Sequence, residues 1–227
     1  MRDRDKEALR KKIQEFWKYR KWPQRLADGR RQILLLTAFG LKPNHYLLDV
    51  GCGWLRGGIY LIDYLDKGRY YGFDKEEKQL IRGDVLLKGV GLEYKKPKIE
   101  FIYGRKELGP FIGSVRFDYM LANSVFTHID PYMADRLFAS VIHFLKDEGL
   151  FFASFYKGDV SAPVIGKPHW SRSNEYGSVV YPLRFFVDLA EKYGLSVNYI
   201  PKEPDEHGQH WMYFYNKEFV DERWGEV

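Results

Sequence analysis

The sequence predicts an α/β protein with a doubly wound, mostly parallel seven-stranded sheet and helices on both faces, preceded by helices at the amino terminus. One observation is that short apolar segments typical of buried parallel strands alternate with amphipathic helical segments over most of the 227 residues. A second is that the apolar segment 46–50 runs directly into the glycine turn Gly51-Cys52-Gly53 and then into a helical pattern. A strand, a tight glycine turn and a helix start form a typical ligand site of parallel sheets.

The composition indicates one domain with a substantial core. Apolar residues make up 45% of the chain and aromatic residues 17%, which excludes a disordered protein. No apolar run approaches the length of a membrane span, and the charged amino terminus does not suit a signal peptide, so we expect a cytoplasmic protein. We expect a single domain over 1–227, with a helical lid at 1–40, an α/β core at 41–216 and a charged tail at 217–227.

The net charge of +5 is concentrated at the amino terminus, where residues 1–31 carry twelve Lys and Arg against five Asp and Glu. Such a segment suits RNA, a membrane surface or an acidic substrate. However, Leu9, Ile13, Phe16 and Trp17 recur at helical spacing, which favours the solvated face of a packed helix. Nucleic acid is therefore not the favoured partner.

The amino-terminal half is expected to contain two helices and then three strands separated by helices. The first helix covers about 3–20, and the second has Asp28 as its N-cap and Gly40 as its end. The elements that follow are a strand at 46–50, a helix at 55–66, a strand at 70–74, a helix beginning near Glu76 and a strand at 98–104.

The carboxyl-terminal half continues the alternation. Asp130 and Pro131 are a typical cap and first residue of a helix, which we expect to run through Leu145 to a turn at 146–149. The other expected elements are a strand at 117–124, a strand at 150–156, a helix at 183–193 and strands at 195–200 and 210–216. Segment 157–182 is rich in Gly, Pro and Ser and is expected to be a substrate loop.

A second ligand signal is Asp74, which ends the strand 70–74 about twenty residues after the glycine turn. Folds that bind nucleosides hold the ribose hydroxyls with an acidic residue at this position. The dinucleotide motif G-x-G-x-x-G would place glycine where this chain has Arg56, so a nicotinamide cofactor fits less well.

Together these motifs resemble the class I S-adenosylmethionine-dependent methyltransferases. Within that class, the run Gly-Cys-Gly-Trp-Leu-Arg-Gly-Gly at 51–58 and the run Ser-Val-Phe-Thr-His-Ile at 124–129 are similar to a group of small bacterial enzymes. The resemblance covers about 30–215 and implies a Rossmann-like methyltransferase fold with an antiparallel last strand. It departs at Leu55, where many relatives have a third glycine, and at Arg105, where many have an Asp facing the adenine amine.

The resemblance implies that S-adenosylmethionine is the cofactor. The backbone of the glycine turn would hold its methionine end, Asp74 its ribose, and Asn123 and the chain beside Arg105 its adenine side. Asp49, at the end of the first strand, either orients the turn or meets a cationic group of the ligand. The candidate cofactor-binding residues are Asp49, Gly51, Cys52, Gly53, Asp74, Lys75, Arg105 and Asn123.

His128 is the candidate catalytic base, because it follows the fourth strand and some resembled enzymes are thought to use a histidine there. The alternative is a histidine that caps the following helix or orders the cofactor. No metal is expected, since the fourth strand ends in Asn123-Ser124 with no carboxylate before Asp130. A single cysteine also excludes a cysteine-based zinc cluster.

We therefore expect a methyltransferase acting on an oxygen, or less favourably a nitrogen, of a small metabolite or glycan unit. One alternative is an RNA methyltransferase that uses the basic amino-terminal helix. Another is a cofactor-binding protein without catalysis. The sequence leaves the acceptor and the oligomeric state open.

Overall fold

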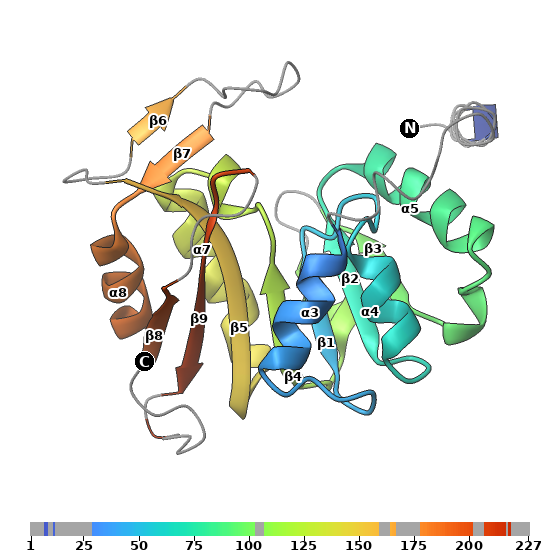
Figure 1. Ribbon diagram of the computed structural model, residues 1–227, viewed down its shortest axis with the longest axis horizontal. Helices are drawn as coiled ribbons and strands as arrows, with labels where there is room; N and C mark the ends of the chain where they lie inside the picture. The colour runs from blue at the N-terminus through green and yellow to red at the C-terminus, as the bar shows by residue number, and fades with distance from the viewer. Residues whose placement is uncertain are drawn as a thin grey trace. The chain divides into compact units, whose positions relative to one another are not determined.

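The structure is a computed structural model that describes residues 7, 8, 11, 29–102, 107–158, 164–166, 178–201, 207–216 and 218. Residue contacts divide the chain into two compact units, Met1–Ser114 and Val115–Val227, which are described one after the other (Figure 1). Most of the expected helix at 3–20 and of the tail at 217–227 lies outside the described residues. Within the described residues, no helix combines the length and the apolar character needed to span a membrane.

The first unit contains three parallel strands, β1 (Leu47–Val50), β2 (Tyr70–Asp74) and β3 (Lys98–Phe101). The strand β2 lies in the middle and pairs with both others, with Leu47 opposite Tyr70 and Tyr71 opposite Lys98. All of β1 and most of β2 are buried, as their continuous apolar sequences predict. The strand β3 ends at Phe101, earlier than expected, and residues 103–106 lie outside the described part.

Helices cover both faces of these strands. The unit contains α3 (Arg30–Ala38), α4 (Gly58–Tyr64), α5 (Glu77–Gly89) and the short α6 (Gly109–Ile112). Successive side chains of β2 point to opposite faces. The hydroxyl of Tyr70 lies 2.6 Å from where a Cβ of Gly58 would be, so this face packs on α4. The ring of Tyr71 lies 5.8 Å from that of Phe111 in α6, on the other face.

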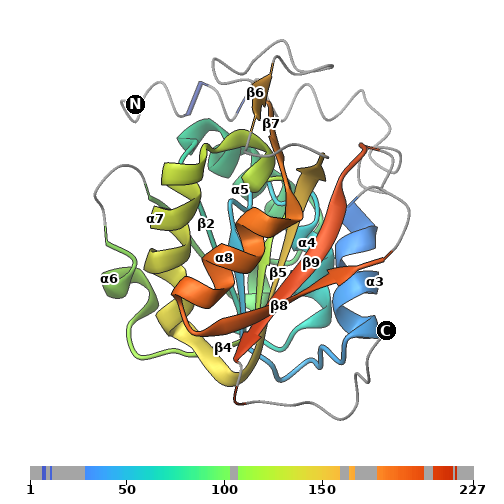
Figure 2. The same cartoon turned by 90° about the vertical axis from the view of Figure 1, so that its left-hand side faces the viewer.

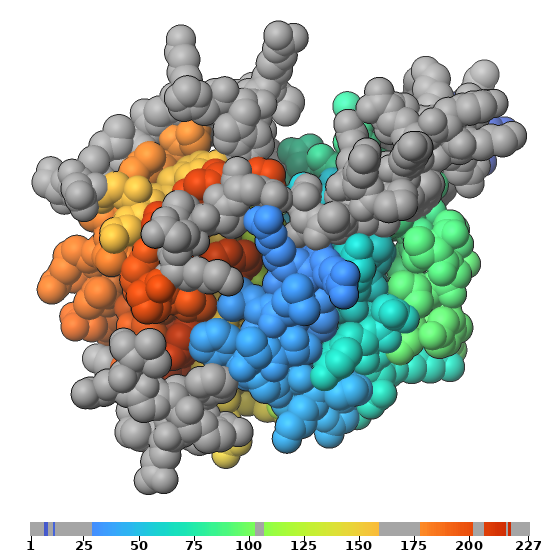
Figure 3. All heavy atoms as spheres, in the orientation of Figure 1, coloured from blue at the N-terminus to red at the C-terminus, as the bar shows by residue number. Residues whose placement is uncertain are grey.

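Two helix starts in the first unit differ from the expected ones. The cap position of α3 is Gly29, whereas Asp28 lies outside the described residues. The helix α4 begins at Gly58 and not at Leu55, because Leu55 has a φ of 62° that a right-handed helix excludes. The buried Leu55 side chain instead packs beside Gly58 and Gly83. Figures 1 and 3 show α3 against α4, and the two helices are in contact.

The second unit contains β4 (Phe117–Ala122), β5 (Leu145–Lys157), β8 (Leu195–Ile200) and β9 (His210–Asn216). The strands β4 and β5 are parallel, and β9 is antiparallel to both β5 and β8. The antiparallel last strand that the resemblance implied is therefore present. All seven expected strands are found in the described residues, three in the first unit and four in the second.

The boundary between α7 (Pro131–Val141) and β5 was predicted wrongly. Asp130 caps α7 as expected, because its Oδ1 accepts a 2.8 Å hydrogen bond from the N–H of Met133. The helix ends at Val141, however, and the strand begins at Leu145, opposite Phe117. The expected turn at 146–149 lies inside β5 as an irregularity, since Leu150 is already opposite Tyr119. Strand pairing of the buried Leu145 overrides the local turn signal.

The segment 157–182, expected to be a loop, contains two further strands among its described residues. These are β6 (Val164–Gly166) and β7 (Ser178–Tyr181), which are antiparallel to each other. The strand β7 also pairs in parallel with the end of β5, where Val180 lies opposite Tyr156. Its alternate residues Val179 and Tyr181 are buried, which explains why a Ser- and Gly-rich segment forms a strand here.

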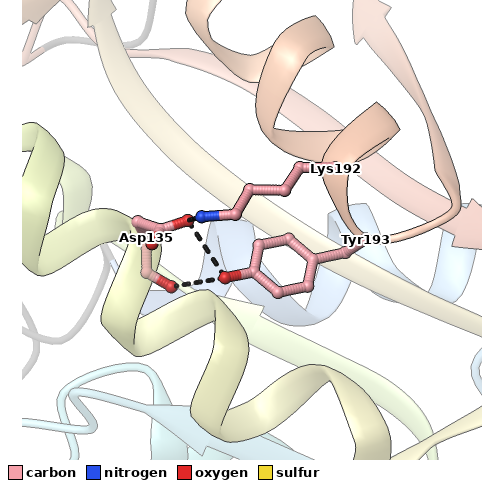
Figure 4. A network of polar contacts seen from close by, with 3 residues as sticks. All are labelled: Asp135, Lys192 and Tyr193. Atoms are coloured by element: carbon pink, nitrogen blue, oxygen red, sulfur yellow. Dashed lines mark hydrogen bonds and ion pairs between the residues drawn. The ribbon is translucent and has the colours of Figure 1, made fainter.

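The helices α7 and α8 (Leu183–Lys192) pack on one face of the second unit, as Figure 2 shows. The ring of Phe138 in α7 lies 4.8 Å from that of Phe214, and the ring of Phe186 in α8 lies 4.8 Å from that of Phe155. Asp135 joins the two helices, because its carboxylate lies 2.6 Å from Nζ of Lys192 and 3.0 Å from the hydroxyl of Tyr193 (Figure 4). Lys192 accordingly lowers the pKa of Asp135.

Candidate functional site

The glycine turn that follows β1 is fastened to the end of β2. Gly51 and Gly53 have φ angles of 71° and 55°, which glycine adopts without strain. The N–H groups of Gly51 and Cys52 both donate to the carbonyl oxygen of Phe73, over 2.9 and 3.0 Å. The N–H of Gly53 donates to Oδ2 of Asp74 over 2.8 Å. The turn and the strand-end carboxylate therefore form one hydrogen-bonded structure within the first unit.

Asp74 accepts a hydrogen bond at each carboxylate oxygen. Oδ2 accepts from Gly53, and Oδ1 accepts from the N–H of Glu76 over 2.8 Å. Burial raises the pKa of Asp74, and these two backbone donors oppose that rise. Each oxygen of a carboxylate has two lone pairs, so each retains one for a hydroxyl group of a ligand. The two backbone bonds fix the carboxylate in place before any ligand binds.

The glycines of the turn and of the helix start have different surroundings. No described atom lies within 4 Å of where a Cβ of Gly53 would be, so one side of the turn is open. At Gly57, by contrast, a Cβ would lie 2.0 Å from Oε1 of Gln32. At Gly29 a Cβ would lie 2.1 Å from the carbonyl oxygen of Arg56. The start of α3 therefore packs directly on the backbone that follows the turn, whereas the Gly53 side leaves room for a ligand.

Asp49 lies in β1, two residues before the turn begins, and is 4% exposed. Its Oδ2 accepts a 2.6 Å hydrogen bond from the hydroxyl of Tyr70, which is itself buried. The pKa of Asp49 is raised to about 7, because burial and the negative charge of Asp74 raise it by more than the Tyr70 hydroxyl lowers it. Burial likewise raises the pKa of the Cys52 thiol. Sequence reasoning missed Tyr70 as the partner of Asp49, although a buried carboxylate needs such a donor.

Lys75 and Arg105 are the other two expected cofactor-binding residues from this part of the sequence. Lys75 directly follows Asp74, and its side chain is exposed. Arg105 falls within residues 103–106, outside the described part of the chain. The first unit thus brings together Asp49, Gly51, Cys52, Gly53 and Asp74.

Asn123 and His128, the other two expected site residues, belong to the second unit. Asn123 follows the carboxyl end of β4 and is half-buried, with its Oδ1 3.4 Å from Oγ of Ser154. His128 is the last residue of a 3-10 turn, η3 (Phe126–His128), and is also half-buried. Its backbone N–H donates to the carbonyl oxygen of Val125 over 2.9 Å.

Ser124, between these two residues, has a φ of 59°, in the left-handed region that non-glycine residues rarely adopt. Its hydroxyl lies 2.7 Å from Nε2 of Gln209, and its N–H donates to Oγ of Ser154 over 2.7 Å. Sequence reasoning missed Gln209. No local signal relates position 209 to position 124, which is 85 residues away.

The described residues contain no group of three or more His, Cys, Asp or Glu side chains that could hold a metal ion. The two carboxyl groups near the glycine turn are bonded to protein donors, Asp49 to the Tyr70 hydroxyl and Asp74 to two backbone N–H groups. Their acceptor character suits a polar organic ligand.

No protein-family model matches the sequence. Several solved structures are similar to the chain. Magnesium protoporphyrin IX methyltransferase (ChlM) from Synechocystis PCC 6803, with bound S-adenosylmethionine, has a TM-score of 0.61 at 14% identity over 85% of this chain and 79% of that one. The glycopeptide N-methyltransferase MtfA, complexed with S-adenosylmethionine, has a TM-score of 0.61 at 12% identity over 87% and 99% of the two chains.

A third similar structure is an S-adenosylmethionine-dependent methyltransferase from Methanosarcina mazei, with a TM-score of 0.55 at 14% identity over 79% of this chain and 94% of that one. At identities this low the similarity establishes the fold. The predicted class, a Rossmann-like methyltransferase fold, is confirmed.

Proposed function

We propose that this protein is an S-adenosylmethionine-dependent methyltransferase that transfers the methyl group to an oxygen of a small metabolite or glycan unit. The observation that carries this proposal is the hydrogen bond between the Gly53 N–H and Asp74, which unites an open glycine turn and a strand-end carboxylate. The fold supports it, because similar solved structures are methyltransferases with S-adenosylmethionine bound. Nitrogen is the less favoured acceptor atom, although one of these structures is an N-methyltransferase.

The first unit would hold the cofactor mainly through its backbone. The N–H groups of Gly51, Cys52 and Gly53 all donate within the protein. We therefore assign the carbonyl oxygens of the turn to the ammonium group of the methionine end, with the open side of Gly53 as the approach. Asp74 would accept hydrogen bonds from the ribose hydroxyls with its remaining lone pairs.

The remaining assignments follow from the resemblance. Lys75, beside Asp74, is the residue we assign to the edge of the cofactor site. Asn123 and the chain beside Arg105 are assigned to the adenine side. Asp49 would orient the glycine turn, and its hydrogen bond with the Tyr70 hydroxyl would hold it in place.

S-adenosylmethionine supplies an electrophilic methyl group, so the protein must orient the acceptor and remove its proton. We assign proton removal to His128, at the end of the turn that follows β4. Imidazole suits this task, because the unperturbed side chain titrates near neutral pH. The half-burial of His128 is compatible with both solvent access and contact with a substrate.

Cofactor binding is tested by isothermal titration of the full chain with S-adenosylmethionine and with its demethylated product, S-adenosylhomocysteine. We expect both to bind the wild-type protein and Asp74→Ala to lose most of the affinity. Absence of binding to the folded wild type would refute the proposal. The acceptor is then found by incubating lysate with cofactor carrying an isotopically labelled methyl group and identifying the labelled molecule by mass spectrometry.

The role of His128 is tested on the acceptor found in this way. His128→Ala should lower kcat by about a hundredfold or more, the usual contribution of a positioned base. His143→Asn is the matched control, because His143 lies in the short turn η4 (Ile142–Phe144), where its ring is tilted against that of Phe144 with centroids 4.0 Å apart. Undiminished turnover of His128→Ala would remove the assignment. Cofactor binding without any labelled product would favour a non-catalytic cofactor-binding protein.

An RNA acceptor is a second candidate, favoured by the twelve Lys and Arg within residues 1–31. Removal of residues 1–21 distinguishes an RNA methyltransferase from a small-molecule methyltransferase. Contacts to phosphate predict RNA binding that weakens steeply with salt and is lost on truncation. A small-molecule enzyme would show neither effect.

A further inference from the structure

The inference concerns Ser124, which carries a strained backbone just after β4. Its φ of 59° places a side chain with a Cβ in the left-handed region. Such conformations persist only where the surroundings hold them, and they are concentrated at functional sites. The residues that hold Ser124 in this conformation therefore affect the turn that follows it in the chain.

Ser154 and Gln209 hold Ser124 from two neighbouring segments. Oγ of Ser154 accepts the N–H of Ser124 and donates to Oε1 of Gln209, both over 2.7 Å. Nε2 of Gln209 donates to Oγ of Ser124 over 2.7 Å. Ser154 is 0% and Gln209 2% exposed, so water does not compete for these bonds. Ser154 lies on β5, and Gln209 immediately precedes β9, which pairs with β5.

The turn that carries His128 is built on Ser124. The carbonyl oxygen of Ser124 accepts a 2.8 Å hydrogen bond from Oγ1 of Thr127, whose side chain is fully buried. The carbonyl oxygen of the next residue, Val125, accepts the N–H of His128. A change in the backbone angles of Ser124 would therefore redirect both bonds and rotate the backbone that carries the imidazole.

We propose that Gln209 is a positioning residue for His128, acting through Ser124, and this inference rests on the proposed function. Its amide is suited to the task because it presents a donor and an acceptor at once. Nε2 lies 2.7 Å from the Ser124 hydroxyl, while Oε1 lies 2.7 Å from the Ser154 hydroxyl and 3.0 Å from that of Ser124. Charged glutamate would supply no N–H donor and would bury a charge, and leucine would supply neither a donor nor an acceptor. The residue directly before β9 is in this way connected to the candidate catalytic turn.

The experiment compares Gln209→Leu and Gln209→Glu with a matched control, Asn198→Leu. Asn198 also forms an amide-to-hydroxyl bond within this sheet, from Nδ2 to the Tyr213 hydroxyl over 2.8 Å, and it lies on β8, opposite Tyr213 of β9. Three readouts are used: kcat for labelled methyl transfer, the Kd for S-adenosylhomocysteine, and the ring C–H NMR signals of His128, assigned with His128→Gln.

We expect Gln209→Leu to lower kcat by about tenfold or more, since small misplacements of a reacting group have effects of that order. The Kd for S-adenosylhomocysteine should change far less, and the His128 ring signals should shift while those of His143 stay in place. Asn198→Leu should leave kcat and the His128 signals unchanged. If Gln209→Leu fails to fold, judged by circular dichroism, Gln209→Glu carries the same expectations.

A rescue variant separates positioning from a merely structural role. Glycine adopts a φ near 59° without strain, so Ser124→Gly combined with Gln209→Leu should recover much of the lost kcat and return the His128 signals towards their original positions. Unchanged kcat in both Gln209 variants would overturn the inference, as would a loss of kcat without movement of the His128 signals. If the wild type binds no cofactor, the proposed function fails. The positioning role is tested separately by the NMR signals, because unshifted His128 signals in Gln209→Leu would refute it whether or not the cofactor binds.

Discussion

The backbone N–H of Gly53 donates a 2.8 Å hydrogen bond to Oδ2 of Asp74, across 21 residues of sequence. The turn after β1 and the carboxylate that ends β2 are thus prepared together before a ligand binds. Such preorganisation lowers the entropy lost on binding. The proposed cofactor site depends on this bond and on the open space beside Gly53.

Gly53→Ala should weaken binding of S-adenosylhomocysteine by at least about tenfold, a difference of about 1.4 kcal/mol, because the new Cβ enters the open side of the turn. Gly68→Ala is the matched control. Both glycines have positive φ, 55° and 78°, and no described atom lies within 4 Å of either Cβ position. Each variant should therefore lose about 1 kcal/mol or more of stability from backbone strain. Equal Kd values for the two variants in isothermal titration would contradict the proposed site.

Asp49 should make the protein less stable as the pH rises from about 4 to 7. The pKa of Asp49 is about 7 in the folded protein against 3.8 for the free group, so over this range the folded state holds a proton that the unfolded state has released. The resulting slope is at most about 1.4 kcal/mol per pH unit, and it vanishes above pH 7, where both states are ionised.

Urea unfolding at pH 5 and pH 8 measures this contribution. Asp49→Asn should lose less stability than the wild type between these two values, while Asp66→Asn, at an exposed position, should follow the wild type. Tyr70→Phe removes the donor that lowers the pKa of Asp49, so its effect should be larger at pH 8 than at pH 5. Parallel pH profiles for Asp49→Asn and the wild type would show that the carboxyl titrates as in an unfolded chain.

Lys95 should stabilise the end of α4. Its Nζ donates to the carbonyl oxygens of Asp63 and Leu65 over 2.6 and 2.9 Å, where a helix leaves its last carbonyls without partners. Lys95→Met is expected to lose about 1 kcal/mol in denaturant unfolding, because both the bonds and the favourable charge at the helix end are removed. Lys88→Met removes an ion pair with Asp84 and a charge in the last turn of α5, and it should lose less than Lys95→Met, about 0.5 kcal/mol. Similar losses in the two variants would argue against a capping role.

Tyr181 should connect β7 to the backbone that follows His128. Its hydroxyl donates to the carbonyl oxygen of Ile129 over 2.6 Å, and its side chain is fully buried. Tyr181→Phe leaves this carbonyl without its donor and is expected to lose about 1 to 3 kcal/mol of unfolding free energy. Tyr94→Phe removes a hydroxyl from a side chain that is 62% exposed and should be nearly neutral. A neutral Tyr181→Phe variant would mean that water or another group replaces the bond.

Local chemistry explains which parts of the structure could be predicted from the sequence. The mostly apolar segments at 46–50 and 70–74 predict buried strands, and Asp130-Pro131 predicts a helix cap from the next few residues alone. The turn at 146–149 and the loop at 157–182 were predicted from local composition. Described residues of both segments form strands instead, because pairing with β4 and β5 outweighs that composition.

The sequence by itself determined the α/β class, the order of the seven strands along the chain and the glycine turn with its carboxylate. The class and the strand order follow from the periodicity of apolar residues. The turn follows from its glycines, and its carboxylate follows from the short spacing between Gly53 and Asp74. Only the tertiary structure decided that Asp49 bonds to Tyr70, that Gln32 packs on Gly57, and that Gln209 holds Ser124. Each of these pairs joins residues at least 21 positions apart, and partners at such distances are selected by packing of the whole chain and not by any local pattern.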